Sequence, residues 1–432
     1  MATYSEPFLL SSKGSIRGTA YGFSNKSVTL NGKTHVVWLD RPATVCGRTY
    51  DHAARSWSPT YTLFEGSDNH TSPALVADSY ADSHLRLMLG PHGGGWNSGR
   101  FKWAISENPG RIDAWKWECD VGYLATYPAL LHTPQGLDVV AYRGGEWPPS
   151  TMFQRQRSLK HWTKAREIFW QDIEPQYTHY GAYIDCDAQG TLYLACHFYN
   201  VGNDLFGPDE KHKSCGIAIL KSANLGDTWT SMAGEPVAVP ALYHDRIGIP
   251  PLGEDFRLGG LAIDSHGTVW VVTGDVDARV RNISLSHWTS GGWVTRDIGG
   301  FLPRERMAVD TFLTIDSKDR LHLAVTALLP DTLKDKAVGT VWGHASCEVF
   351  HMVSADGGET FTCRQVSPTD PDRANWLPNI SKNSACHPVD NPAILYTHGA
   401  PGAVPVREPQ PKLARWCLSW LSFHFCPAVC CC

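Results

Sequence analysis

One hairpin pattern recurs along the chain and constrains the fold more than any other sequence feature. Two copies stand in a row between residues 120 and 200, and each has an apolar run, a turn that ends in Gly and a returning apolar run. The two turns are His132-Thr-Pro-Gln-Gly136 and Asp185-Cys-Asp-Ala-Gln-Gly190. Short β-rich runs on either side of a Gly-containing turn predict pairs of antiparallel strands.

The same pattern appears in further copies from one end of the chain to the other. Returning strands are expected to begin near residues 34, 85, 137, 191, 268, 320 and 393, which are seven starts separated by 51 to 77 residues. A repeat of about fifty residues with several short strands is the signature of a β-propeller blade. The sequence therefore predicts an all-β fold, a seven-bladed β-propeller that forms a single domain over residues 1–402.

Composition agrees with this fold class and excludes others. The chain has 432 residues, of which 39 are Gly and 28 are Pro, while charged residues make up only 19%. This is a turn-rich β composition. The formal net charge of −5 gives no basic footprint for nucleic acid, and no apolar run approaches the length that spans a bilayer. We expect a monomer without nucleic-acid or membrane partners.

The two ends of the chain differ from the repeats. The N-terminus has no basic region followed by a long apolar core, so no secretory signal is visible. Residues 403–432 begin with a Pro-rich stretch and end with five of the 13 cysteines. We expect this Cys-rich tail to lie outside the core of the propeller.

A second, shorter repeat supports the blades. Ser222-Ala-Asn-Leu-Gly-Asp-Thr-Trp229 and Ser354-Ala-Asp-Gly-Gly-Glu-Thr-Phe361 match position by position, and a looser relative follows Ser106. Asp or Asn in such a turn bonds its own backbone, and Gly takes a positive φ. These are Asp-box turns, which we expect to stabilise the outer part of a blade and to have no catalytic role.

The open ends of neighbouring hairpins bring together side chains that can do chemistry. Residues equally far from a hairpin turn lie side by side, so Tyr127 should lie near Arg143, and Tyr180 near His197. His70 and His92 flank the preceding turn in the same way, and Arg257 stands just before the next hairpin. One residue of this kind is usually structural, whereas a set that shares one structural position indicates a site.

This set favours β-elimination from a uronic acid. It lacks the two facing carboxylates that most glycoside hydrolases use. An Arg can bind the uronate carboxylate and stabilise the charge that develops when the C5 proton leaves. A His or a Tyr can take that proton, and another can protonate the departing oxygen. The sequence does not assign these two roles.

Several segments resemble the BNR-repeat family, which includes propeller polysaccharide lyases such as ulvan lyases and rhamnose–glucuronate lyases. The resemblance rests on Asp68-Asn-His-Thr-Ser-Pro-Ala-Leu, Thr126-Tyr-Pro-Ala-Leu, Leu192-Tyr-Leu-Ala-Cys-His-Phe and Asn375-Trp-Leu-Pro-Asn-Ile, and extends over about residues 20–400. It implies a seven-bladed propeller and an extracellular role, and it assigns catalysis to His70, His92, Tyr127 and the carboxylate-binding Arg143. It places Tyr180 and His197 in substrate binding.

The resemblance also bears on cofactors and partners. It implies an acidic polysaccharide or oligosaccharide as substrate, and the chemistry needs no cofactor. Family members can carry a structural metal, for which His212 and Cys215 are weak candidates because two residues at this spacing do not make a site by themselves.

Three functions stay open at this point. The first is a lyase that acts at a uronic acid. The second is a glycoside hydrolase of rhamnosyl-glucuronate or sialidase type on the same fold. The third is a glycan-binding propeller without catalysis, since fold alone does not determine function.

Overall fold

The computed structural model describes most of the chain. The described residues are 3–4, 7–66, 69–92, 99–146, 149–170, 181–200, 213–244, 246–250, 256–275, 283–329, 343–399, 421–426 and 428–429. Only the backbone is described for 3–4, 199–200, 213–215, 275, 421–426 and 428–429. Among these residues, no helix combines the length and the apolar character needed to cross a membrane.

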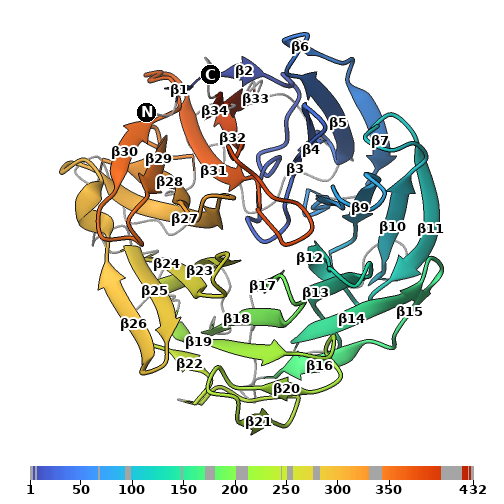
Figure 1. Ribbon diagram of the computed structural model, residues 1–432. Coiled ribbons are helices and arrows are strands. Elements are labelled where there is room, and N and C mark those ends of the chain that lie inside the picture. Colours follow the sequence, from blue (N-terminus) through green and yellow to red (C-terminus); the bar gives the residue numbers. More distant parts are fainter. Residues whose placement is uncertain are drawn as a thin grey trace.

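Six antiparallel sheets are each built from one continuous stretch of chain, and they follow one another around a ring (Figure 1). The first contains β3 (Ser27–Leu30), β4 (Lys33–Asp40), β5 (Thr44–Asp51), β6 (Ser56–Trp57) and β7 (Tyr61–Glu65). The second contains β8 (Ala74–Ala77), β9 (Leu85–Leu89), β10 (Phe101–Ser106) and β11 (Trp115–Val121). The third contains β12 (Thr126–His132), β13 (Asp138–Gly144), β14 (Ser150–Ser158), β15 (His161–Trp162) and β16 (Arg166–Phe169).

The other three continue in the same direction around the ring. The fourth contains β17 (Ala182–Cys186), β18 (Leu192–Asn200), β19 (Lys213–Ser222), β20 (Trp229–Thr230), β21 (Pro236–Val237) and β22 (Gly248–Ile249). The fifth contains β23 (Phe256–Ile263), β24 (Val269–Asp275), β25 (Ile283–Thr289) and β26 (Gly292–Asp297). After a 3-10 helix at Gly299–Phe301, the sixth contains β27 (Met307–Ile315), β28 (Leu321–Leu328), β29 (Glu348–Ser354) and β30 (Thr362–Gln365).

A further sheet combines strands from both ends of the chain and closes the ring between β27–β30 and β3–β7 (Figure 1). Its order is β31 (Ala374–Ile380), β32 (Ile394–Gly399), β33 (Leu421–Cys426) and β2 (Phe8–Leu9). A separate two-stranded pair joins β1 (Thr3–Tyr4) to β34 (Ala428–Val429). The prediction of an all-β β-propeller is confirmed. The predicted number of seven blades is not, because only six sheets are built from continuous stretches and this one is composite.

The composite sheet includes residues from the Cys-rich tail. Residues 421–426 lie in β33, which pairs with β32 on one side and β2 on the other. Leu421, Phe423 and Phe425 alternate with smaller or polar residues, which is the period of a strand. The pairing of β33 bears on the expectation that residues 403–432 lie outside the core of the propeller, and that expectation stays a prediction.

The seven predicted returning strands all form, each beginning within one residue of its expected start. They are β4, β9, β13, β18, β24, β28 and β32. Each is the second strand of its sheet and is buried along most of its described length, as in β13 and β28. Such strands are apolar on both faces because each sheet is covered by the next one around the ring. Outer strands such as β26 contain only half-buried and exposed positions.

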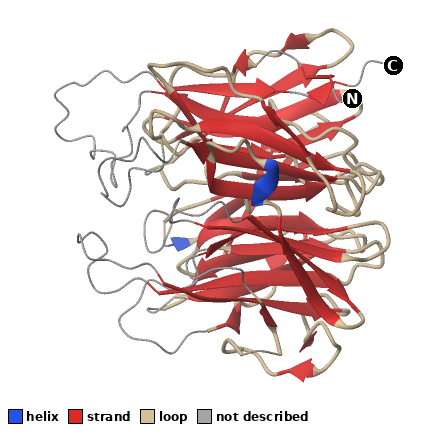
Figure 2. Cartoon of the chain, turned by 90° about the vertical axis from the view of Figure 1, so that its left-hand side faces the viewer, coloured by secondary structure: helices blue, strands red, loops and turns tan. Residues whose placement is uncertain are grey.

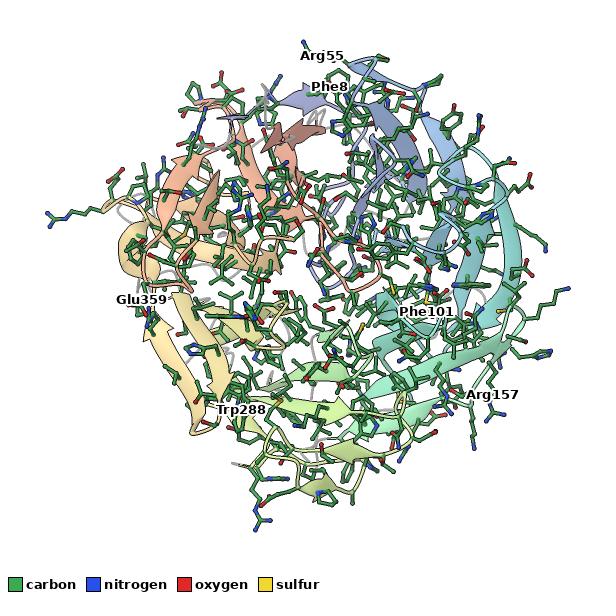
Figure 3. All side chains as sticks on the ribbon, viewed as in Figure 1. Phe8, Arg55, Phe101, Arg157, Trp288 and Glu359 are labelled. Carbon is green, nitrogen blue, oxygen red and sulfur yellow. The ribbon has the colours of Figure 1, made fainter. Side chains whose placement is uncertain are left out.

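Packing between sheets forms the core. Seen edge-on, the ring consists almost wholly of strands (Figure 2). Side chains fill the spaces between the sheets: Phe101 lies inside the ring, whereas Arg157 and Glu359 extend from its outer edge (Figure 3). Trp103 and Trp229 are almost fully buried between neighbouring sheets. Each large apolar side chain that is buried in this way contributes about 1.5–3 kcal/mol.

The Asp-box turns lie where the sequence places them, between the third and fourth strands of their sheets. In one of them the Ser354 hydroxyl oxygen accepts the Gly358 N–H at 2.8 Å, and Asp356 accepts the Thr360 N–H at 3.0 Å. Arg296 of the preceding sheet donates to the Gly358 carbonyl at 3.1 Å. The turn thus closes its own backbone and ties two neighbouring sheets together at the outer edge.

Candidate functional site

The innermost strands carry bulges near their open ends. The ladder register shifts in β12 at 126–129, in β23 at 258–260, in β27 at 308–310 and in β31 at 376–379. Two of these bulges share a local design, because Tyr127 and Leu377 each have a positive φ and each precede a Pro. A bulge bends its strand and re-aims a side chain, and a non-Gly residue with positive φ is uncommon. Tyr127 therefore leaves the ladder of β12.

His70, His92 and Tyr127 form one compact group. The rings of His70 and His92 are stacked, with centroids 4.0 Å apart and planes 12° apart. The Tyr127 ring lies 6.4 Å from His70 and 6.0 Å from His92. Tyr127 is buried, whereas both imidazoles are half-buried. The structure thus places two partly accessible imidazoles against a buried phenol, and they come from the two neighbouring sheets that the sequence indicates.

Arg143 lies at the same end of the β12–β13 hairpin. It pairs with Thr126 on one side and with Thr151 on the other, so it is one position from the bulge that holds Tyr127. Its side chain is buried, with 6% of its surface exposed. The expected proximity of Arg143 to Tyr127 along the backbone is therefore found.

The N-terminal segment 14–25 lies against these bulges, and the sequence did not predict its position. The Ser24 hydroxyl donates to the Pro128 carbonyl at 2.6 Å, and the Thr19 hydroxyl donates to the Leu377 carbonyl at 2.7 Å. The segment thus bridges the two Pro-containing bulges across the ring. It brings Tyr21 to 4.5 Å from the Tyr127 ring, and Arg17 Nη1 donates to the Tyr21 hydroxyl oxygen at 2.5 Å.

A cavity lies next to this group at the centre of the ring. It holds about 620 Å³ of empty space, open solvent included. Segment 14–25 and the inner strands β17, β18, β23, β24, β27 and β31 supply its lining, and Figure 1 shows these strands around the centre. Its aromatic walls are Tyr21, Phe23, Tyr183 and Phe312, and its other polar side chains are His197, Arg257, Asp310 and Thr311.

The polar lining of the cavity is partly predicted. His197 and Arg257 both face it, although His197 is only 2% exposed and its ring lies 5.9 Å from Phe256. Burial, with the nearby Asp310 charge, raises the pKa of Tyr183, so this phenol stays protonated. Asp310 is a carboxylate that the sequence reasoning missed. Asp310 lies at the bulge of β27, ahead of the hairpin turn, as Tyr127 lies at the bulge of β12. A comparison of the two hairpins in the sequence could have identified Asp310.

Tyr21 links the two parts of the site, since its ring contacts Tyr127 and the residue is among those that line the cavity. No repeat signal could have found it, because segment 14–25 precedes the first hairpin. Tyr180 and His212 lie outside the described residues, and so does the side chain of Cys215. Within the described part of the chain, no group of three or more His, Cys, Asp or Glu could hold a metal ion.

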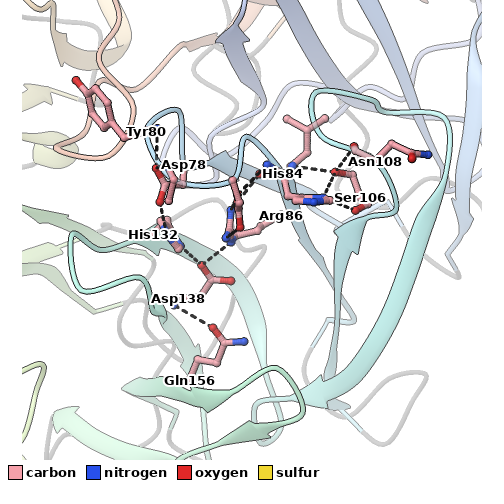
Figure 4. Close-up of polar contacts among 12 residues, drawn as sticks. Asp78, Tyr80, His84, Arg86, Ser106, Asn108, His132, Asp138 and Gln156 are labelled. Carbon is pink, nitrogen blue, oxygen red and sulfur yellow. Dashed lines mark hydrogen bonds and ion pairs between the residues drawn. The ribbon is translucent and has the colours of Figure 1, made fainter.

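A different polar cluster lies on the turn face, where the hairpins reverse (Figure 4). The His132 ring stands between two carboxylates, with Nδ1 2.6 Å from Asp138 and Nε2 3.2 Å from Asp78. Arg86 pairs with Asp138 at 3.4 Å, and Trp103 donates to Asp138 at 2.9 Å. This buried network joins the second and third sheets, so its groups are engaged in structure.

The segment between β31 and β32 crosses the centre of the ring on this face (Figure 1). The Cys386 carbonyl accepts the Ser79 N–H at 3.0 Å, and the Val389 carbonyl accepts the Ser317 N–H at 2.9 Å. These bonds tie the segment to the second and sixth sheets. Lys382, on the same segment, holds its Nζ 5.3 Å from the Tyr183 ring, below the cavity.

Together these features define a β-propeller with a polar, aromatic-lined cavity at its centre and an imidazole–phenol group beside it. The chain belongs to the BNR repeat-containing family, whose match covers residues 33–300, more than half of its length. This confirms the family resemblance seen in the sequence. A search of curated proteins gave no match.

Solved structures with the same fold include polysaccharide lyases. A PL25 ulvan lyase bound to GlcA(1-4)Rha3S is 15% identical, with a TM-score of 0.70 over 92% of this chain and 93% of that chain. The polysaccharide lyase Uly1 is 12% identical, with a TM-score of 0.55 over 99% of this chain and 100% of that chain. An α-L-arabinofuranosidase from Fusarium graminearum is also similar, at 11% identity and a TM-score of 0.46 over 76% and 93% of the two chains. At these identities the likeness to the two lyases shows the fold.

Proposed function

We propose that this protein is a carbohydrate-active enzyme that cleaves a glycosidic bond at a uronic acid by β-elimination. The observation that carries the proposal is the stacked His70–His92 pair against Tyr127, beside a central cavity that is lined by His197 and Arg257. The lyases with the same fold, one of them bound to a glucuronate-containing glycan, support this assignment.

The reaction needs a cation, a base and an acid. Arg143 binds the uronate carboxylate and stabilises the negative charge that spreads onto it as the C5 proton leaves. The imidazoles of His70 and His92 and the phenol of Tyr127 are the groups that can accept this proton. His197 and Arg257 bind the sugars that occupy the cavity, together with Tyr180. Aromatic walls such as Phe23 offer flat apolar surface to the sugar rings.

A hydrolase is the second candidate, and Asp310 is the observation that favours it. Hydrolysis of a glycoside uses a carboxylate as acid, base or nucleophile, and Asp310 places one in the cavity. It is the only Asp or Glu among the lining residues that the structure describes, whereas most hydrolases use a pair. Because the cavity lining offers one carboxylate and not a pair, elimination is the better-supported reaction.

Incubation with uronate-rich glycans tests the proposal. Elimination creates a C4–C5 double bond conjugated with the carboxylate, so ultraviolet absorbance should rise together with new chain ends. New reducing ends without absorbance would establish the hydrolase instead. Binding without either product would leave a glycan-binding propeller.

We further propose that the composite sheet is the seventh blade and that residues 421–426 are needed to complete it. Its order of inner hairpin, third strand and outer strand, β31–β32–β33–β2, matches that of the continuous sheets. A chain that ends at residue 402 should therefore unfold at a markedly lower temperature than the full chain. An unchanged melting temperature would show that residues 403–432 lie outside the core, as first expected.

A further inference from the structure

The inference concerns a second cavity, which lies beside the segment that crosses the centre of the ring between β31 and β32 (Figure 1). It holds about 360 Å³ of empty space, open solvent included, and no described residue lines both this cavity and the central one. The inner strands β3, β8, β12 and β17 give it a largely apolar wall. The crossing segment gives it a polar wall, which consists of Lys382, Asn383, Ser384 and His387.

Lys382 is a half-buried cation without an anionic partner. Its Nζ makes no hydrogen bond or ion pair with any described residue, and it lies 5.3 Å from the centre of the Tyr183 ring. Burial lowers the pKa of Lys382, and the negative charge of Asp185 opposes this shift without forming an ion pair. A cation that has lost water and gained no partner is unfavourable, so an anion that enters the second cavity gains a favourable contact.

The neighbouring side chains add further hydrogen-bonding groups. Asn383 Oδ1 accepts the Val389 N–H at 2.7 Å, whereas Asn383 Nδ2 and the Ser384 hydroxyl make no hydrogen bond with residues that the structure describes. His387 is 3% exposed, and neither of its ring nitrogens has a hydrogen-bond partner in the described part of the chain. Buried polar groups are normally hydrogen-bonded, so this concentration of unpaired groups indicates a place for a bound molecule.

We propose that the second cavity is a binding site for a small carboxylate, which is held by the Lys382 ammonium and by donors of the same segment. A carboxylate can accept several hydrogen bonds on its two oxygens, so Lys382, Asn383 and Ser384 can donate to it together. The flexible stem of the lysine lets the ammonium follow the ligand. Asp185 also lines the second cavity, and its negative charge weakens the binding. The site is separate from the residues proposed for elimination and does not depend on that reaction.

The test uses the full chain and formate, the smallest carboxylate. Formate labelled with ¹³C replaces chloride at constant ionic strength, and the width of its NMR line reports binding. A ligand with three non-hydrogen atoms reaches a dissociation constant of about 1 mM at best, so the titration extends well above this concentration. Lys382→Met keeps the stem and removes the charge, so the affinity for formate should fall by about 10-fold or more.

A second variant should change the affinity in the opposite direction. Asp185→Asn removes the opposing charge and keeps an oxygen that can accept the Cys186 N–H, which lies 2.8 Å from Asp185 Oδ1. This variant should bind formate more tightly than the wild type. Lys318→Met is the matched control, since Lys318 is an exposed lysine on a hairpin turn and its loss should leave the affinity unchanged. Melting temperatures of all variants are measured alongside.

The outcomes separate this site from the central cavity. Formate held by Arg143 or Arg257 would still bind to Lys382→Met, so equal affinities of the wild type and this variant would overturn the proposal. A wild-type protein that binds no formate in the presence of chloride would overturn it as well. If Lys382→Met does not fold, Asp185→Asn decides, because an affinity that stays unchanged or falls in that variant would contradict a carboxylate site beside Asp185.

Discussion

The two faces of the ring use the same residue types in different ways. On the turn face, His132 lies between Asp78 and Asp138, within 2.6 and 3.2 Å of their carboxylates. At the open ends of the hairpins, His70 and His92 stack on each other, and the tilted ring of Tyr127 lies 6.4 and 6.0 Å from them, beside a cavity. An imidazole held by two carboxylates has a fixed structural task, whereas we propose that the imidazoles beside the phenol of Tyr127 take part in proton transfer.

A second cluster on the turn face also holds its histidines in buried polar contacts. His322 lies 3.1 Å from Asp316 and 3.0 Å from the ring of His351, and Arg320 donates to Asp316 at 2.6 Å. Burial lowers the pKa of both His322 and His351, so these rings are neutral near pH 7. In this fold, the groups that contact a histidine therefore distinguish structural histidines from those that we propose for catalysis.

The largest effect is expected on the turn face and concerns stability. His132→Ala would leave the Asp78 and Asp138 carboxylates facing each other without the imidazole between them. Disruption of a buried network of this kind costs about 3 kcal/mol or more of unfolding free energy. Chemical denaturation should show this loss, while His161→Ala on an exposed edge strand should show almost none. Equal stabilities would mean that His132 has no structural task, and the comparison between the faces would fail.

The next effect concerns turnover at the open face. Arg143→Ala should lower turnover on a uronate substrate by about 10²-fold or more, because the cation matters most when charge develops on the carboxylate. Arg143→Lys should restore little, since a point charge does not reproduce the planar two-donor guanidinium. Steady-state kinetics with parallel melting curves measure both. Near-full turnover of a stable Arg143→Ala variant would remove Arg143 from the site.

Loss of an imidazole at the open face should affect turnover, whereas loss of His132 should affect stability. His70→Ala removes one ring of the half-buried stacked pair, so unfolding free energy should change by about 1 kcal/mol or less while turnover falls by about 10²-fold. Kinetics and denaturation of the same preparation give both numbers. A variant that lost stability and kept its turnover would behave like His132 and would place His70 among the structural histidines.

A separate effect concerns the pH dependence of stability. Burial raises the pKa of Asp185 to about 7, although the nearby Lys382 charge opposes the shift. A pKa raised in the folded state means that the folded protein holds the proton more tightly, so this contribution to stability is complete below about pH 4 and is lost as pH rises to about 7. Asp185→Asn should remove that slope. Unfolding free energies between pH 4 and pH 8 measure it, with the exposed Asp372→Asn as control. An unchanged slope would show that Asp185 does not titrate there.

Much of the fold can be predicted from the sequence, because the signals for most strands lie in neighbouring residues. Strands such as β18 and β28 are largely apolar and follow an Asp-containing turn, so their starts can be predicted within one residue. The closing sheet depends on pairing between β2 and β33, which are far apart in the chain and carry no repeat. Long-range pairing of this kind has no local signal.

The candidate site divides in the same way. His70, His92 and Tyr127 could be grouped because hairpin geometry fixes which residues lie at an open end. Tyr21 could not be placed, because its position depends on hydrogen bonds from segment 14–25 to two distant bulges. The site residues on the repeated hairpins can therefore be predicted from the sequence, whereas those on segment 14–25 cannot.

The central claim is that the enzyme removes the C5 proton of a uronate. The most direct measurement compares turnover of a uronate substrate that carries hydrogen at C5 with one that carries deuterium there, while ultraviolet absorbance and chain ends are followed together. The account predicts slower turnover of the deuterated substrate, with one unsaturated product for each new chain end. Equal rates for the two substrates, with reducing ends and no absorbance, would contradict it, because hydrolysis leaves the C5–H bond intact.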